Sequence, residues 1–480
     1  MLFQNYRAPA SLYDEAYHQN QVRKVYQNIV EQFNSLALEE FSHLSEFAKI
    51  SFFNQGITFN VYSESAGTEK IFPFDLFPRI ISAQEWERLE KGLVQRTHAI
   101  NAFLQDIYND RKILKDKVIP AELLLNSKSY NPHMEGFVPR GGVYCHISGT
   151  DLIRNEEGTW YILEDNVRSP SGVSYVYANR TALKRSFANV LYQDSVASIE
   201  SYTDELLATI ESVAPDGVDE PNSVLLTPGM YNSAYYEHTF LAYMMGIELV
   251  EGRDLFVENG FVYMKTIYGP VRVDVVYRRI DDDFLDPLAY RPDSLLGVPG
   301  IMEAYREGNV TIINAPGTGV ADDKAVYSYM PDIIKYYLDE EPIIENVPTY
   351  ICAREEDYKY VMDNLDSLVT KPVAESGGYG ITIGPKASKK ELSESRKAIA
   401  ANPRNYIAQP MMRLSVHPTY IDDEKAFEPR HIDLRTFCLS GRDREHVLKG
   451  GLTRVALKKH SLIVNSSQGG GSKDTWVMEE

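Results

Sequence analysis

Several features that mark other classes of protein are scarce in this sequence. Among 480 residues there are only three cysteines, Cys145, Cys352 and Cys438, and they are too far apart for a CxxC pair or a zinc-binding spacing. An odd number of scattered cysteines argues against a disulfide framework. A reducing, cytoplasmic compartment is therefore the expected location.

Long apolar runs are also missing. No stretch approaches the roughly 20 apolar residues that a membrane-spanning helix needs. Residues 1–20 lack the apolar core of a signal peptide. These absences predict a soluble protein with no membrane partner.

Positive charge is in deficit. The chain has 49 Lys and Arg against 68 Asp and Glu, which gives a formal net charge of −19. Nucleic acids and anionic membranes attract clustered Lys and Arg, so we expect neither as the main partner. An acidic protein tolerates a cationic substrate such as a polyamine, although the charge serves solubility first. The length allows two or three domains.

The common nucleotide-binding motifs are absent. The sequence contains no GxxxxGK[ST], no GxGxxG between a strand and a helix, and no kinase glycine loop with HRD and DFG partners. Residues 469–475 (GGGSKDT) contain glycines and a lysine in the wrong frame. A P-loop enzyme, a dinucleotide-binding fold and a protein kinase are therefore excluded.

Two other stretches nevertheless carry the chemistry of an ATP site. Residues 161–172 (YILEDNVRSPSG) predict a strand ending in Glu164 and Asn166, whose side chains share one face and offer the oxygen ligands that Mg²⁺ prefers. Residues 368–380 (LVTKPVAESGGYG) predict a strand that ends at Lys371 and a glycine loop. Lysine supplies charge for phosphate oxygens, and glycines let backbone N–H groups approach them.

Three further features complete the predicted site. The turn at residues 155–158 (NEEG) predicts a hairpin that brings Asp151 opposite the face of Glu164 and Asn166. Lys324 precedes a helical stretch. Residues 406–412 (YIAQPMM) read as a hinge strand whose backbone and Gln409 can meet an adenine edge.

The rest of the sequence contains both helical and strand-like patterns. Helical spacing extends over residues 17–38, residues 57–62 alternate like a strand, and Ser82 with Glu85 forms a capping box before a long apolar stripe. From residue 223 the pattern becomes α/β. The predicted elements there are strands at 223–227, 247–250, 261–265 and 271–278 and a helix at 232–245 that Gly246 ends.

Together these parts resemble the ATP-grasp superfamily in its circularly permuted form, because the Glu-x-Asn at residues 164–166 precedes both lysines. The same order occurs in the synthetase domain of glutathionylspermidine synthase. Sequence segments typical of bacterial proteins related to that enzyme occur along the chain. They are GITFNVY (56–62), LEDNVRSPSGVSY (163–175), YRRIDDDFLDP (277–287), GTGVADDKAVY (317–327) and residues 450–474.

The resemblance implies roles for individual residues. Asp151, Glu164 and Asn166 match the Mg²⁺ ligands, Arg454 matches an arginine near the transferring phosphate, and a further set matches the ATP contacts. That set is Lys324, Lys371, Ser376, Gly377, Gly378, Tyr379 and Gly380; Gln409 on the hinge strand is the further candidate for an ATP contact. The synthetase has an arginine where this chain has Gly149, so Arg154 or Arg168 supplies that charge, or the acid substrate is held differently.

The implied fold is α/β (α+β): a circularly permuted ATP-grasp fold with a pre-ATP-grasp α/β domain and a helical N-terminal region. The expected divisions are residues 1–115 (helical), 116–203 (metal-binding hairpin), 204–319 (pre-ATP-grasp domain) and 320–480 (lysines, glycine loop and hinge). A homodimer is the base-rate expectation for assembly.

The implied activity is an ATP-dependent carboxylate–amine ligase that works through an acylphosphate, with small-molecule acid and amine substrates and with ATP and Mg²⁺. Two alternatives stay open, a small-molecule kinase on the same fold and a nucleotide-binding assembly protein without turnover. For the aspartates at 281, 282, 283 and 286 we favour a solvated loop over a substrate-facing role. For His238 we favour packing over catalysis.

Overall fold

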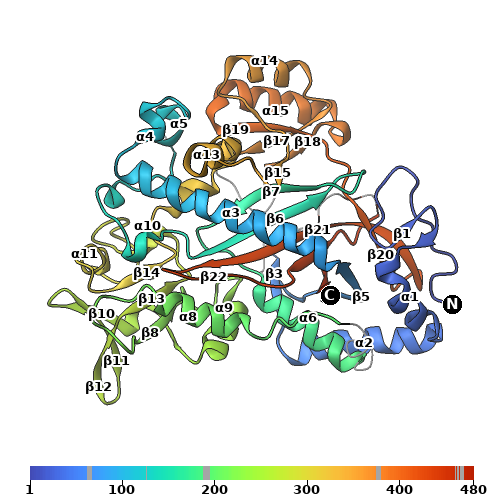
Figure 1. Cartoon of the computed structure of the whole chain (residues 1–480), viewed down its shortest axis with the longest axis horizontal. Helices are drawn as coiled ribbons and strands as arrows, with labels where there is room; N and C mark the ends of the chain where they lie inside the picture. Colours follow the sequence, from blue (N-terminus) through green and yellow to red (C-terminus); the bar gives the residue numbers. More distant parts are fainter. Residues whose placement is uncertain are drawn as a thin grey trace.

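The computed structural model describes residues 1–61, 68–125, 127–187, 195–373, 380–459, 461, 464 and 470–479. A large mixed sheet crosses the centre of the molecule, with a small antiparallel sheet at one end and a parallel sheet at another (Figure 1). No helix in these ranges is both long and apolar enough to cross a bilayer.

The central sheet combines strands from distant parts of the chain. Its order is β15-β7-β6-β21-β23-β24-β5, and β20 and β22 also pair with β21. The strands are β5 (Phe74–Ile81), β6 (Ile147–Arg154), β7 (Trp160–Asn166), β15 (Glu345–Asn346), β20 (Val416–Ile421), β21 (Ala426–Ser440), β22 (Glu445–Val447), β23 (Leu452–Val455) and β24 (Gly471–Val477). Segments from the first and the last parts of the chain therefore pair within one sheet.

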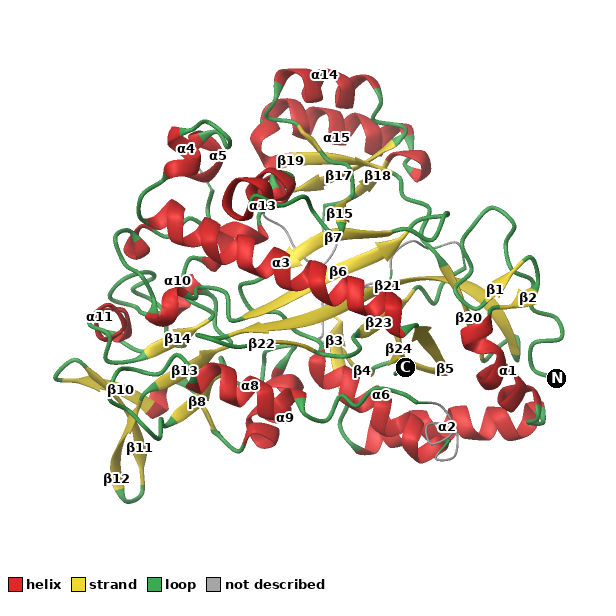
Figure 2. Ribbon diagram, viewed as in Figure 1, coloured by secondary structure: helices red, strands yellow, loops and turns green. Residues whose placement is uncertain are grey.

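Helices cover both faces of this sheet. On one face lies α3 (Ala83–Tyr108), which crosses it diagonally (Figure 2) and whose Leu89 and Leu93 pack with Leu152 and Ile162 of the sheet. Ser82 accepts a hydrogen bond from the backbone of Glu85, so the predicted N-cap is confirmed. On the other face, α6 (Val173–Ser186) shares a core with apolar residues of β21 and β23.

The predicted α/β unit contains a parallel sheet in the order β14-β13-β8-β9. Its elements are α8 (Tyr202–Glu211), β8 (Ser223–Leu226), α9 (Tyr235–Met245), β9 (Glu248–Val250), β13 (Val275–Arg278), α10 (Asp282–Leu285), α11 (Ile301–Arg306) and β14 (Thr311–Ile313). Gly246, with a φ of +68°, ends α9 as predicted. A separate antiparallel sheet projects from this unit, made of β10 (Leu255–Glu258), β11 (Phe261–Thr266) and β12 (Gly269–Val273).

The small sheet carries the second half of the predicted site. Its order is β16-β19-β17-β18, and α14 (Glu355–Asp363) and α15 (Lys389–Ala401) cover its outer side (Figure 1). The strands are β16 (Tyr350–Ile351), β17 (Leu368–Pro372), β18 (Thr382–Ile383) and β19 (Tyr406–Pro410). Val361, Leu365 and Ile399 form its buried core.

Two predicted boundaries are wrong. The expected helix over 17–38 begins instead with a hairpin, β1 (Tyr17–His18) and β2 (Gln21–Val22), because Gln19 and Asn20 adopt positive φ values of 50° and 63°. The expected strand over 271–278 is divided at Asp274, since its second half joins the parallel sheet. The remaining elements are α1 (Gln27–Asn34), α2 (Leu38–Asn54), β3 (Thr58–Val61), β4 (Thr68–Ile71), α4 (Lys112–Lys115), α5 (Ala121–Leu125), α12 (Lys324–Tyr327) and α13 (Met330–Leu338).

Candidate functional site

The acidic hairpin forms as predicted. Asp151 on β6 lies directly opposite Glu164 on β7, and Asn166 lies opposite Gly149. The turn is held by Asn155, whose side-chain Oδ1 accepts hydrogen bonds from the backbone N–H groups of Glu157 and Thr159 at 3.0 and 2.9 Å. The hairpin therefore places two carboxylates and an amide on one face of the central sheet.

Arginines on the next two strands neutralise the first carboxylate. Arg435 on β21 donates two hydrogen bonds to Asp151, at 2.6 and 2.8 Å, and Arg454 on β23 donates a third at 2.8 Å. Arg454 also binds Asp433 at 2.8 and 2.5 Å. Burial alone would raise the pKa of Asp151, but the two guanidinium groups outweigh burial and hold that pKa well below its usual range.

Sequence reasoning identified Arg454 but missed Arg435 and Asp433. Both lie on β21, two residues apart, and their side chains therefore point to the same face as Asp151. The sequence of residues 432–438 (IDLRTFC) could have revealed them. Its two charged residues are two positions apart and the residues around them are apolar or small, which is the pattern of a strand with one charged face.

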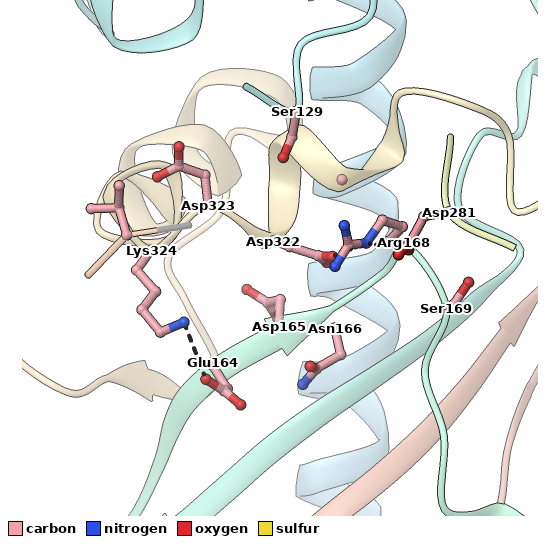
Figure 3. Close-up of a pocket in the computed structure, with 12 residues that line it drawn as sticks. Ser129, Glu164, Asp165, Asn166, Arg168, Ser169, Asp281, Asp322, Asp323 and Lys324 are labelled. Atoms are coloured by element: carbon pink, nitrogen blue, oxygen red, sulfur yellow. Dashed lines mark ion pairs between the residues drawn. The ribbon is translucent and has the colours of Figure 1, made fainter. Parts of the chain in front are cut away.

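The first predicted lysine reaches the acidic hairpin. Lys324 Nζ lies 3.7 Å from Glu164 Oε2 (Figure 3). The neighbouring Asp323 caps the short helix α12, because its carboxylate accepts a hydrogen bond from the Ala325 backbone at 2.9 Å. Two segments separated by about 160 residues in sequence thus meet, as the predicted site requires.

The second lysine approaches from the small sheet. Lys371 is 9% exposed, and its Nζ donates a hydrogen bond to Gln409 Oε1 at 2.7 Å. Burial lowers the pKa of Lys371 to about 8, although Glu164 and Asp151 act to raise it. The ammonium group of Lys371 is therefore near enough to the acidic hairpin for both carboxylates to act on its pKa.

Gln409 links the second lysine to the neighbouring segment that carries Thr349. Its side chain is 2% exposed, accepts from Lys371, and donates to Thr349 Oγ1 at 2.8 Å. Its side-chain amide therefore positions Lys371, and its second N–H leaves the predicted contact with an adenine edge as a prediction. The contribution of the hinge backbone stays a prediction.

The glycine loop is only partly described. Ser376, Gly377, Gly378 and Tyr379 lie outside the described residues. Gly380 has a φ of +71°, and a Cβ atom at this position would lie 2.8 Å from Cγ of Pro372. Both the backbone conformation and the close approach require glycine here.

A cavity of about 190 Å³ adjoins the hairpin. Figure 3 shows Arg168 between Asp281 and Asp322, and the ion pairs measure 3.5 and 3.7 Å. Burial raises the pKa of Asp322 to about 6, although Arg168 and a 2.5 Å hydrogen bond from the Val167 backbone lower it. The lining residues are Ser129, Glu164, Asp165, Asn166, Arg168, Ser169, Asp281, Gly319, Asp322, Asp323, Lys324 and Val373.

Arg154, the third arginine candidate, is not brought to this cavity. It is paired with Glu15 at 3.1 Å and with Glu85, and it stacks over Trp160. Arg154 is three residues from Asp151 on the same strand, so their side chains point to opposite faces of the sheet. The structure brings together Arg168 and Arg454 with the hairpin and leaves Arg154 on the α3 side.

The expectation of a solvated aspartate loop is wrong for two of its members. Asp282 pairs with Arg278 at 2.7 Å, and Asp286 is 1% exposed and accepts hydrogen bonds from the backbone of Gly300 and Met302. Asp281 lines the cavity, and Asp283 is exposed. The loop is therefore built into the fold, because its carboxylates satisfy buried donors.

Asn314 is a positioning residue that the sequence reasoning missed. It follows the last strand of the parallel sheet and is 2% exposed. Its amide accepts from the backbone of His146 and Ile147 and donates to the carbonyl groups of Ile147 and Val167, all at 2.6–2.9 Å. It joins the start of β6 to the end of β7.

The side-chain oxygens on the hairpin suit a hard divalent cation as ligands. Asp151 and Glu164 lie directly opposite each other on the two strands, and the buried amide nitrogen of Asn166 has no partner in the described part of the chain. Oxygen ligands of this kind fit Mg²⁺. Within the same residues, no group of three or more His, Cys, Asp and Glu side chains could hold a metal, so a metal at the hairpin would take the amide oxygen of Asn166 as its third ligand.

Comparison with known proteins identifies relatives over most of the chain. A protein of Synechocystis sp. without an assigned function is 51% identical over 472 residues, which cover 98% of each chain. A Mycobacterium tuberculosis protein, also without an assigned function, is 48% identical over 98% of this chain and 84% of its own. A Frankia casuarinae protein, named provisionally as a glutamate–cysteine ligase, is 42% identical over 88% of this chain, which spans about half of its length.

The fold has a solved counterpart. A glutathione synthetase-like effector from Globodera pallida, in its apo form, superimposes with a TM-score of 0.61 at 12% sequence identity, over 92% of this chain and 98% of the effector. The predicted α/β architecture is confirmed. The family model described as circularly permuted ATP-grasp type 2 matches residues 78–456. The chain therefore belongs to the circularly permuted ATP-grasp type 2 family.

Proposed function

We propose that the protein is an ATP-dependent carboxylate–amine ligase that works through an acylphosphate. The observation that carries the proposal is the approach of Lys324 to within 3.7 Å of Glu164, which lies opposite Asp151, with the charge of Lys371 close enough to interact with both carboxylates. Two ammonium groups beside hard oxygen ligands are what a metal-bound triphosphate needs.

The reaction would proceed in two displacements. A substrate carboxylate attacks the γ-phosphorus of ATP, and ADP leaves with the electrons of the broken P–O bond. An amine then attacks the activated acyl carbon, and phosphate leaves as the C–N bond forms. Negative charge accumulates on phosphoryl oxygens and then on the acyl oxygen, so fixed cations accelerate both steps.

The residues divide this work by position. Lys324 and Lys371 would bind the phosphates, and Arg435 and Arg454 lie on the neighbouring strands where they can face the transferring group. Glu164 and Asn166, with Asp151, would hold Mg²⁺, which supplies neutralising charge when bound.

The relatives support the ligase class. The Frankia protein carries a ligase name, although this chain matches only about half of it. That name belongs to the whole relative, so it supports the reaction class here and leaves the acid and the amine open.

ADP release tests the proposal. The purified protein is incubated with ATP, Mg²⁺ and pools of carboxylic acids, with hydroxylamine as a trapping nucleophile. We expect ADP and a hydroxamate in equal amounts for at least one acid. A stable phosphorylated product without a hydroxamate would support a kinase instead, and ATP binding without turnover would support an assembly role.

A matched pair of variants locates the activity. Glu164→Ala should lower the rate by about 10²–10³ or more, because it removes a charge at the transferring phosphate. Glu156→Ala, on the exposed turn of the same hairpin, should change the rate less than twofold. Full activity of Glu164→Ala would remove the metal assignment.

A further inference from the structure

The cavity beside the hairpin has an uncompensated negative charge. Three of its five carboxylates have their own cations: Asp165 binds Arg96 at 2.6 Å, Asp323 binds Arg404 at 3.1 Å, and Glu164 lies 3.7 Å from Lys324. Asp281 and Asp322 instead share the single guanidinium group of Arg168. One positive charge between two carboxylates leaves room for a second cation.

The same cavity also has unused hydrogen-bond donors. In the described ranges Arg168 makes only the two ion pairs, at 3.5 and 3.7 Å, and no hydrogen bond. The Arg168 side chain is 39% exposed, so its N–H groups are accessible to a ligand in the cavity. A guanidinium group carries five N–H donors, so an acceptor group fits beside these carboxylates.

We propose that this cavity binds the amine substrate of the ligase and that this substrate is an α-amino acid. Asp281 and Asp322 would hold its ammonium group, and Arg168 would hold its carboxylate (Figure 3). The inference rests on the proposed function. Glu164 and Lys324, to which we assign metal and phosphate binding, line the same cavity, so an amine bound there would lie beside the nucleotide.

Simpler ligands leave part of the cavity unsatisfied. An alkylamine would neutralise the aspartates but leave the donors of Arg168 without an acceptor. A dicarboxylate would satisfy Arg168 and repel the aspartates. A zwitterion whose two charges lie close together can bind both the aspartates and Arg168. A cavity of about 190 Å³ has room for a small zwitterion.

The chemistry of the second displacement balances with this ligand. The α-nitrogen forms the C–N bond as the acyl C–O bond to phosphate breaks. The ammonium group gives up two protons in total, one to the departing phosphate and one to solvent. No oxidant or further reactant is needed.

Binding is tested by calorimetry with each common L-amino acid, with Mg²⁺ and a non-hydrolysable ATP analogue present. We expect at least one to bind, and Arg168→Ala or Asp281→Asn to weaken it by about 10-fold or more, as expected for a lost charged hydrogen bond. Arg168→Lys should restore part of the affinity. Asp283→Asn, the same charge change at an exposed position outside the cavity lining, should alter the affinity less than twofold.

Two blocked forms of the bound amino acid sharpen the test. Its methyl ester lacks the carboxylate charge and its N-acetyl form lacks the ammonium charge, so both should bind at least 10-fold more weakly. The proposal is overturned if no amino acid binds, or if both blocked forms or both cavity variants bind as the parent does. Circular dichroism of each variant confirms the fold.

Turnover separates this inference from the proposed function. In Arg168→Ala, amide formation with the amino acid should fall about 10-fold further than hydroxamate formation with hydroxylamine, because only the amino acid has a carboxylate for Arg168 to hold. If wild-type protein forms neither ADP nor hydroxamate, the proposed function fails, whereas the binding measurements still decide the nature of the cavity.

Discussion

At the scale of single residues, Lys371 combines a functional charge with a structural cost. It is 9% exposed, and burial lowers its pKa to about 8. The ammonium form is therefore the main form at pH 7 and the minor form at pH 9. Phosphate attraction requires the ammonium form.

The affinity for ATP should consequently fall as pH rises. With a pKa of about 8, the protonated fraction drops roughly tenfold between pH 7 and pH 9. We expect the dissociation constant of ATP, measured by calorimetry, to rise by a similar factor. Lys371→Arg should flatten the profile, since arginine stays charged. A flat profile in the wild-type protein would contradict the role of Lys371.

Lys371 should also lower the free energy of unfolding of the protein when no nucleotide is bound. Its pKa is lower in the folded protein than the ordinary value of 10.5, so the unfolded chain binds more protons between pH 8 and 10.5. This contribution makes the fold more stable as pH rises through that window and costs stability below it. Lys371→Met should raise the free energy of unfolding at pH 7 by ~1 kcal/mol or more.

Thermal unfolding at pH 7 is the measurement for this variant. Lys359→Met, at an exposed position of α14, is the matched control and should leave the melting temperature nearly unchanged. A lower melting temperature for Lys371→Met would show that the hydrogen bond to Gln409 outweighs the burial of charge.

Residue roles were predictable where the signal is local. The pair Asp151 and Glu164 follows from a turn and the period of a strand, so their alignment could be inferred. Arg435 could not be placed in the same way, because its partner Asp151 lies 284 residues earlier in the chain. Pairing between distant strands depends on the whole sheet.

At the scale of elements, α3 supports the hairpin from behind. Arg96 on this helix donates hydrogen bonds of 2.7 and 2.6 Å to Asp165, which stands between Glu164 and Asn166 and points to the opposite face of the sheet. Arg96 also binds Asn346 at 2.8 Å. One buried side chain thus ties the helix to the strand that carries the predicted metal ligands.

Arg96→Ala should destabilise the protein by about 3–5 kcal/mol, because it leaves the buried carboxylate of Asp165 without its partner. The control is Arg88→Ala on the exposed side of the same helix, where the change should stay within about 0.5 kcal/mol. Midpoints of urea unfolding compare the two. Equal midpoints would show that Asp165 finds another partner.

Elements with their own start and stop signals were predictable. The cap at Ser82 and the stop at Gly246 both act within a few residues. The hairpin at Tyr17–Val22 was missed because the apolar spacing of that segment favoured a helix, whereas positive φ values at Gln19 and Asn20 turn the chain.

At the scale of the whole molecule, the candidate site lies where two sheets face one another. Asp151 and Glu164 belong to the central sheet, and Lys371 belongs to the small one. A ligand held by both stabilises their arrangement. ATP with Mg²⁺ at 100 times its dissociation constant should stabilise the protein by about 2.7 kcal/mol.

The melting temperature with and without chelator measures this effect. We expect most of the stabilisation to disappear in EDTA, since the carboxylates would then repel the phosphates. Equal stabilisation by ATP in EDTA would contradict the metal role of the hairpin. Lys324→Ala should also reduce the shift.

The arrangement of sheets was predictable only through family resemblance. Alternation and turns identify strands, but nothing local shows that β6 joins β21 or that the small sheet faces the hairpin. The division into four domains stays a prediction.

The position of β24 has a consequence for how the chain is made. This strand lies between β23 and β5, and it pairs in parallel with β5, which precedes it by about 390 residues. During synthesis on the ribosome, β5 must therefore wait for almost the entire chain to emerge before its neighbour exists. Contacts of such high sequence separation slow folding and expose an unpaired edge meanwhile. Refolding of this protein should accordingly be slow and chaperone-dependent, and truncation before Gly471 should leave an aggregation-prone product.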